Sequence, residues 1–171
     1  GTSLVYDIVR VITWINSSDS ISCLILTGNG KAFSSGGNIK EMRDKAGTFG
    51  GGPGEIIDKY RRGIHRMSLA MHSLEVPVIA AVNGPAIGAG FDLACMCDIR
   101  LGCENTLLGE TFINLGLIPG DGGAWFLQRL IGAYPELNTM RISLYSMGQK
   151  LDATAAELVS ERETVESLGL I

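Results

Sequence analysis

The chain has 171 residues, 46% of them hydrophobic and 19% charged, which is the composition of a globular protein with a core of its own. Its 14 basic and 18 acidic residues give a net charge of −4, which argues against a nucleic-acid-binding surface. No apolar run reaches the roughly 18 residues that a membrane-spanning helix needs, and the start lacks a signal-peptide pattern, so we expect no membrane partner and a cytoplasmic or, in a eukaryote, mitochondrial-matrix protein.

The first half of the chain alternates between helical and extended patterns. Apolar residues recur at steps of three and four at Leu4, Ile8, Val11, Ile12 and Ile15. This spacing predicts a helix over 4–15. The nearly all-apolar run 21–27 predicts a buried strand, and the Gly-rich stretch 44–54 predicts a mobile loop. Helical spacing returns over 56–74.

The second half continues the alternation. The short apolar runs 78–82 and 99–101 predict strands, and GLIPGDGG at 116–123 predicts a turn. The helices expected here are 88–96, 124–131 and 136–145. Strands that alternate with helices indicate an α/β fold with a largely parallel sheet. No linker interrupts the pattern, so we expect one domain over 1–171.

Three segments have the composition of a ligand site. LTGNGKAFSSGGNIKEM at 26–42 and VPVIAAVNGPAIGAGFDLACMCD at 76–98 each pass from a strand into a glycine-rich turn. Such turns present unpaired backbone N–H groups, and a following helix adds the positive end of its dipole. Two N–H donors aimed at one point would form an oxyanion hole. The third segment, 108–130, adds the carboxylates Glu110 and Asp121.

Each of these signals alone has a plainer explanation. Gly88 and Gly90 could serve only tight packing of strand against helix. They do not complete a dinucleotide-binding fingerprint, because Leu93 stands where the next glycine is expected. A phosphate-binding loop of the G-x-x-x-x-G-K-[ST] type is also missing from the sequence.

In their order and spacing, the three segments resemble the enoyl-CoA hydratase/isomerase family, the crotonases. FSSGGNIK, NGPAIGAGFDLA and GLIPGDGG match the hallmark stretches of that family, and the resemblance covers nearly all of 4–160. It implies a crotonase-like fold of stacked ββα units. It also implies a coenzyme A thioester as substrate, with neither a cofactor nor a metal.

The resemblance assigns roles to particular residues. The thioester oxygen would be held by the backbone N–H groups of Gly37 and Ala89. The residues expected to line the substrate cleft are Ser35, Gly36, Gly37, Asn38, Ile39, Lys40, Gly88, Ala89, Phe112 and Pro119. Asn38 departs from the family, which usually has Asp there.

The acid and base positions depart further. The family's first catalytic glutamate aligns with Asp92, which can still act as a base, but the second aligns with Phe112, which cannot transfer a proton. Glu110 could replace it if the local register differs, and Asp121 falls where other crotonases sometimes place an acid or base. Structural roles remain open: Asp92 as a cap or arginine partner, Asp121 as an N-cap, and Glu110 as a surface carboxylate.

Hydration of a 2-enoyl-CoA in fatty-acid β-oxidation or related metabolism is therefore the first functional expectation. Double-bond isomerisation is the alternative, since a single base can serve it. A catalytically silent acyl-CoA-binding protein is a third hypothesis, and RNA binding is disfavoured by the acidic balance.

The remaining expectations concern histidines, cysteines and assembly. His65 and His72 are expected to be non-catalytic. The cysteines, at positions 23, 95, 97 and 103, are expected to be reduced and buried. Against the family pattern, the chain should lack an N-terminal hairpin and, beyond 151–171, the C-terminal helices that build trimers. By resemblance, a homotrimer or dimer of trimers is expected.

Overall fold

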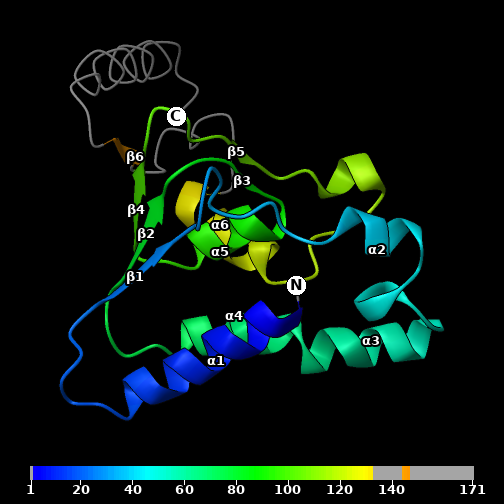
Figure 1. Cartoon of the computed structure of the whole chain (residues 1–171), viewed down its shortest axis with the longest axis horizontal. Coiled ribbons are helices and arrows are strands. Elements are labelled where there is room, and N and C mark those ends of the chain that lie inside the picture. The colour runs from blue at the N-terminus through cyan, green and yellow to red at the C-terminus, as the bar shows by residue number, and fades with distance from the viewer. Residues whose placement is uncertain (1, 133–143, 147–171) are drawn as a thin grey trace.

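A four-stranded parallel sheet organises the computed structural model, which describes residues 2–132 and 144–146 (Figure 1). Its strands, in spatial order, are β1 (Leu24–Thr27), β2 (Val78–Val82), β4 (Ile99–Gly102) and β6 (Leu144–Ser146). A smaller parallel pair joins β3 (Ala86–Ile87) to β5 (Leu108–Gly109). The expected α/β fold with a largely parallel sheet is confirmed.

Helices pack against this sheet and extend beyond it. The α-helices are α1 (Thr2–Asn16), α2 (Ile39–Arg43), α3 (Pro53–Arg62), α4 (Ile64–His72), α5 (Ala89–Cys95) and α6 (Gly123–Ile131). Two 3-10 helices are η1 (Gly47–Phe49) and η2 (Phe112–Leu115). Figure 1 shows α1 alongside α4, with α5 and α6 between this pair and the small sheet, and α2 and α3 projecting to one side.

Most predicted elements are present, with two corrections in the first half. The strand expected over 21–27 begins only at Leu24, whose N–H donates to the carbonyl of Pro77. The helix expected over 56–74 is divided at Gly63, whose backbone leaves helical geometry at φ −108° and ψ −108°. Spacing could not locate this break, because apolar residues continue at helical steps on both sides of it.

The helix expected over 136–145 lies mostly outside the described residues. The prediction is wrong at its last two positions, Leu144 and Tyr145. These residues belong to β6 and pair with Arg100 and Leu101 of β4. Backbone pairing with a neighbouring strand overrides the helical preference of this short stretch.

Helix α5 is the centre of the hydrophobic core. Residues 90–95 are all buried, and they pack with strand residues such as Val78 and Ala80 and with α1 and α4. The buried Arg100 caps the C-terminal end of α5. Its guanidinium donates to the carbonyls of Cys97, at 2.5 Å, and Ala94, at 3.4 Å. A cation at a helix C-terminus satisfies free carbonyls and complements the dipole. These contacts fix α5, and with it the turn that precedes it.

Candidate active site

The ends of β1 and β2 are joined by one asparagine. The Asn83 side chain accepts from the Gly28 N–H at 2.9 Å and donates to the carbonyls of Gly28, at 2.9 Å, and Gly30, at 3.0 Å. Further along, the Ile87 N–H donates to the Ser34 carbonyl at 2.9 Å. The glycine-rich turns after the two strands therefore run beside each other, as their positions after parallel strands predict.

Two glycines permit this close approach. A Cβ on Gly90 would lie 2.2 Å from the Ser34 carbonyl oxygen. Gly36 has a φ of +76°, and a Cβ there would lie 2.8 Å from the Ile87 oxygen and 3.2 Å from the Ala89 nitrogen. The backbone at 36–37 is thus placed directly against the start of α5.

The N–H groups of Gly37 and Ala89 are available to a ligand. Ala89 is the first residue of α5, so its N–H has no acceptor within the helix. Among the described residues, no hydrogen bond uses the Gly37 N–H. Both residues line the same cavity.

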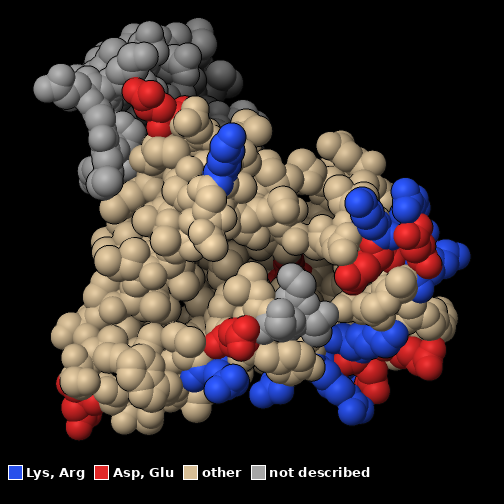
Figure 2. Space-filling model, viewed as in Figure 1, with Lys and Arg blue, Asp and Glu red and all other residues tan. Residues whose placement is uncertain are grey.

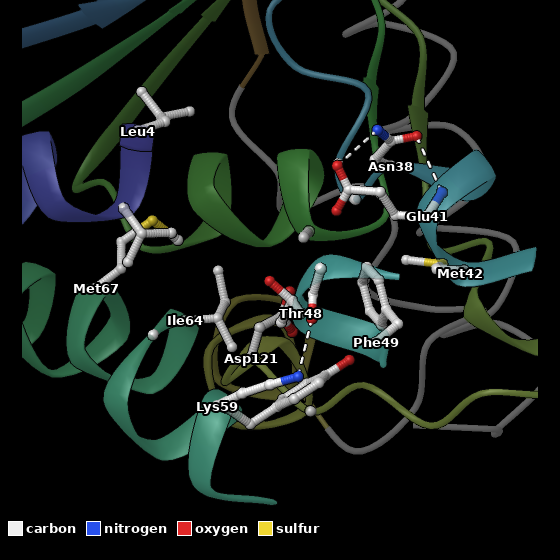
Figure 3. Close-up of a pocket in the computed structure, with 18 of the residues that line it drawn as sticks. Leu4, Asn38, Glu41, Met42, Thr48, Phe49, Lys59, Ile64, Met67 and Asp121 are labelled. Carbon is white, nitrogen blue, oxygen red and sulfur yellow. Dashed lines mark hydrogen bonds between the residues drawn. The ribbon is translucent and has the colours of Figure 1, made fainter. Parts of the chain in front are cut away.

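This cavity, of about 670 Å³, lies between the glycine-rich turns and helices α1 to α4. Figure 3 shows Leu4, Ile64 and Met67 toward one end and Met42 and Phe49 toward the other, with Asp121 between them. Figure 2 shows a hollow with atoms of Asp or Glu residues at its floor. Charged residues gather on the side formed by α2 and α3. The cavity can therefore take an apolar group, and Asp121 lies between its two apolar ends.

Asp121 lines the middle of this cavity (Figure 3). It is only 4% exposed, and its backbone carbonyl accepts a hydrogen bond from the Ser68 hydroxyl. Tyr60 lines the cavity as well, and burial together with the Asp121 charge raises the pKa of Tyr60. Asp121 is not an N-cap, since Gly122 occupies that position of α6 and no side chain caps the helix.

Asp92 lies behind the cavity and does not line it. The side chain is fully buried, and a Cβ on Gly123 would lie 1.7 Å from Asp92 Oδ1. Glu110 and Asp121 are within hydrogen-bond reach of it. Burial is the main cause that raises the pKa of both Asp92 and Glu110. Within the described chain Asp92 has no arginine partner, and Glu110 is a buried rather than a surface carboxyl.

Only part of the predicted binding set reaches the cavity. Its members there are Gly36, Gly37, Asn38, Ala89, Phe112 and Asp121. The structure places the others outside the lining: Ser35, Ile39, Lys40, Gly88, Pro119 and the expected base Asp92. Ser35, Ile39 and Lys40 miss the cavity because their side chains point away from it. Ser34 faces the cavity and Ser35 turns to solvent, and the first turn of α2 directs Glu41 and Met42 inward in place of Ile39 and Lys40.

Asn38 has a structural role that its alignment did not reveal. Its side-chain oxygen accepts from the N–H groups of Lys40, at 3.0 Å, and Glu41, at 3.4 Å, and its amide donates to Glu41 Oε1 at 3.0 Å. These bonds make Asn38 the N-cap of α2. Asn38 thus lacks the negative charge of the family's usual Asp, but it caps α2 and thereby holds this wall of the cavity.

The stretch 44–54 covers one side of the cavity. Lys59 of α3 donates from Nζ to the carbonyls of Gly47, at 3.0 Å, and Gly50, at 2.6 Å. Thr48 and Phe49 between them line the cavity (Figure 3). This stretch, expected as a loop, contains η1 and is tied to α3.

Sequence reasoning missed the cavity residues from the N-terminal helices. The main ones are Leu4, Tyr60, Ile64 and Met67. Helical spacing identified them as apolar-face residues but could not separate a face that contacts core from one that borders a cavity. Only the packing of α1 on α4 turns them toward the site.

The histidines and cysteines lie apart from this centre. His65 Nε2 is 2.6 Å from the Gly120 carbonyl, and neither His65 nor His72 lines the cavity. All four cysteines are free thiols; Cys95 and Cys97 are buried as expected, but Cys23 is exposed because the strand starts only after it. In the described ranges no group of side chains has a metal-binding arrangement. Every helix in those ranges is too short or too polar to span a lipid bilayer.

Comparison with known proteins gives the context for this geometry. The family model described as enoyl-CoA hydratase/isomerase matches residues 2–158. The chain belongs to this family. A probable mitochondrial enoyl-CoA hydratase of Dictyostelium discoideum is 35% identical over 168 residues, covering 96% of this chain and 56% of that relative. A short-chain-enoyl-CoA hydratase of Clostridium acetobutylicum is 41% identical over 123 residues, covering 71% and 44%.

Solved structures of the enoyl-CoA hydratase/isomerase family share this fold. The enoyl-CoA hydratase of Bacillus anthracis is 34% identical, with a TM-score of 0.68, over 78% of this chain and 49% of that one. The crotonase-like fold that the resemblance implied is confirmed. The chain spans about half the length of each of these two relatives and of that structure.

Proposed function

We propose that this chain binds an acyl-CoA thioester and catalyses hydration of a 2-enoyl-CoA. One observation carries the proposal: Gly37 and Ala89, whose backbone N–H groups are unpaired among the described residues, line the same cavity as Asp121. This combination supplies the oxyanion hole and the base that enolate chemistry needs. Membership of the enoyl-CoA hydratase/isomerase family supports it.

The reaction follows from these positions. The thioester oxygen accepts hydrogen bonds from the Gly37 and Ala89 N–H groups. Asp121 takes a proton from water as the water oxygen bonds to Cβ, and the electron pair of the double bond moves to the thioester oxygen as an enolate. The carbonyl then reforms as Cα takes a proton from the Asp121 carboxyl. Each N–H donor contributes about 3–4 kcal/mol of transition-state stabilisation.

Double-bond isomerisation is a second candidate, favoured by a specific observation. Phe112 lines the cavity where the family's second glutamate aligns, so that position offers no acid. The other carboxylates among the described lining residues, Glu41, Glu55 and Asp58, bond to their own helices or helix caps. A single carboxyl, Asp121, could remove a proton from one carbon of the acyl group and return it to another.

Assembly and metabolic setting extend the proposal. We infer a homotrimer or a dimer of trimers that acts in fatty-acid β-oxidation or related acyl-CoA metabolism. Family membership supports this inference. The compartment is proposed as cytoplasmic or mitochondrial, and the name of the Dictyostelium relative favours the second for a eukaryotic source.

Incubation of the purified chain with crotonyl-CoA tests the function. We expect the conjugated thioester absorbance to fall as 3-hydroxybutyryl-CoA forms, with ¹⁸O from labelled water in the product. Conversion of a 3-enoyl-CoA to the conjugated isomer, without hydration, would replace the first reaction with the second. Calorimetric binding of crotonyl-CoA without either reaction would contradict both and leave a silent acyl-CoA binder.

A further inference from the structure

Three buried carboxyl groups, one of them from the cavity-lining residue Asp121, cluster together with no described donor to satisfy them. Asp92 is 0% exposed and Asp121 4% exposed, and Glu110 is partly buried with both carboxyl oxygens enclosed. None of these six oxygens accepts a hydrogen bond from any described donor. Asp92 interacts electrostatically with both Glu110 and Asp121, and Glu110 interacts with Asp121 as well.

Such a cluster cannot be fully ionised. An unpaired carboxylate removed from water is strongly disfavoured, and two like charges at hydrogen-bond distance disfavour each other further. Carboxylate oxygens only accept hydrogen bonds, so a bond between two carboxyls requires a proton on one of them. The cluster must therefore hold at least one proton between its members.

Asp92 is best placed to keep a proton. It is within hydrogen-bond reach of each of the other two, its carboxyl lies against Gly123 at the start of α6, and it does not line the cavity. The titratable groups around it are Glu110, Asp121 and the thiol of Cys95. The nearby cation, Arg100, is committed to the carbonyls of Ala94 and Cys97. No described cation balances an ionised Asp92.

We propose that Asp92 is a positioning residue that acts in its neutral form, donating a hydrogen bond within the Asp92–Glu110–Asp121 cluster. It thereby fixes the carboxylate of Asp121 and adds no second charge beside it. This inference rests on the proposed function, in which Asp121 is the group that touches the substrate. Burial, then hydrogen bonds and charge from Glu110 and Asp121, raise the pKa of Asp92, in agreement with a retained proton.

The Asp92→Asn variant separates this role from that of a base. An Asn amide keeps the shape and a donor but cannot take up a proton, so we expect kcat for crotonyl-CoA to remain within about tenfold of the parent. Asp92→Leu keeps similar bulk without the donor, and its kcat should fall by about 10–100-fold with an altered pH–kcat profile. A base in direct contact with substrate is worth about 10²–10⁴-fold. A loss of kcat above 100-fold in Asp92→Asn would overturn the proposal.

Thermal unfolding tests the proton without any activity. A carboxyl that is neutral when folded and ionised when unfolded binds more protons in the native state, so stability falls as pH rises above its unfolded pKa of about 4. We expect the parent Tm to drop between pH 5 and 8, and the Asp92→Asn Tm to drop less. Asp19→Asn, at an exposed position, should follow the parent.

The kinetic experiment and the thermal-unfolding experiment can fail independently. If the parent turns over no enoyl-CoA, the proposed function fails, and the melting curves still decide whether Asp92 is neutral. If Asp92→Asn loses stability with pH as steeply as the parent, Asp92 is ionised in the folded chain and the inference is wrong.

Discussion

Replacing Asp121 with Asn is expected to lower kcat for crotonyl-CoA by about 10²–10⁴-fold, the usual value of a general acid or base. Asp121 lines the middle of the cavity and is the proposed base, and an amide cannot take a proton from water. The change keeps the size of the side chain, so binding should alter little. Steady-state kinetics and calorimetric binding of crotonyl-CoA measure the two effects.

Asp19→Asn is the matched control for this experiment. It makes the same chemical change at an exposed position with no hydrogen bond to a described partner, and it should leave kcat and KM unchanged. An Asp121→Asn variant that retains full kcat would contradict the assignment of Asp121 as the base. Glu110 would then be the next candidate for that role.

Replacing Gly90 with Ala is expected to damage both stability and activity. The new Cβ would meet the Ser34 carbonyl oxygen at 2.2 Å, and this contact is backbone, which cannot swing aside. Overpacking of this kind costs about 1–3 kcal/mol of unfolding free energy. Because relief requires the two turns to separate, the N–H groups of Gly37 and Ala89 should also lose their common target. Loss of one such donor lowers kcat by about 10²–10³-fold.

Gly54→Ala provides the comparison. Gly54 lies in the first turn of α3 with no atom within 4 Å of an added Cβ. This substitution should be neutral or stabilise the fold by about 0.4–1 kcal/mol. Urea unfolding and kcat, measured on both variants, check the pair. Equal stability and equal kcat in the two variants would contradict the close packing of the turns.

The contact between the two glycine-rich turns was predictable, because it follows from the sequence pattern within each segment. Apolar runs of strand length, each followed by a glycine turn, place those turns at one edge of a parallel sheet. Gly36, Gly37 and Ala89 came from this rule, from glycine at close backbone contacts and from the resemblance. The observed contacts between 34–37 and 87–90 agree with it.

The direction of side chains was not predictable to the same degree. Asp92 occupies the aligned position of a catalytic glutamate, yet the place of α6 decides that its carboxyl faces Gly123 rather than the cavity. Likewise, Tyr60 and Met67 line the cavity only because α3 and α4 diverge at Gly63 and α4 packs on α1. These are tertiary effects between segments far apart in the chain, and spacing within one segment carries no information about them.

Amide NMR can show whether the Gly37 and Ala89 N–H groups bind the thioester oxygen. The ¹⁵N-labelled chain would be titrated with crotonyl-CoA and, separately, with a thioether analogue that lacks the carbonyl oxygen. We predict large downfield proton shifts at Gly37 and Ala89 with the thioester, much smaller shifts with the thioether, and no shift at Gly54. If saturating thioester leaves both amide resonances at their free positions, these two N–H groups do not form the oxyanion hole.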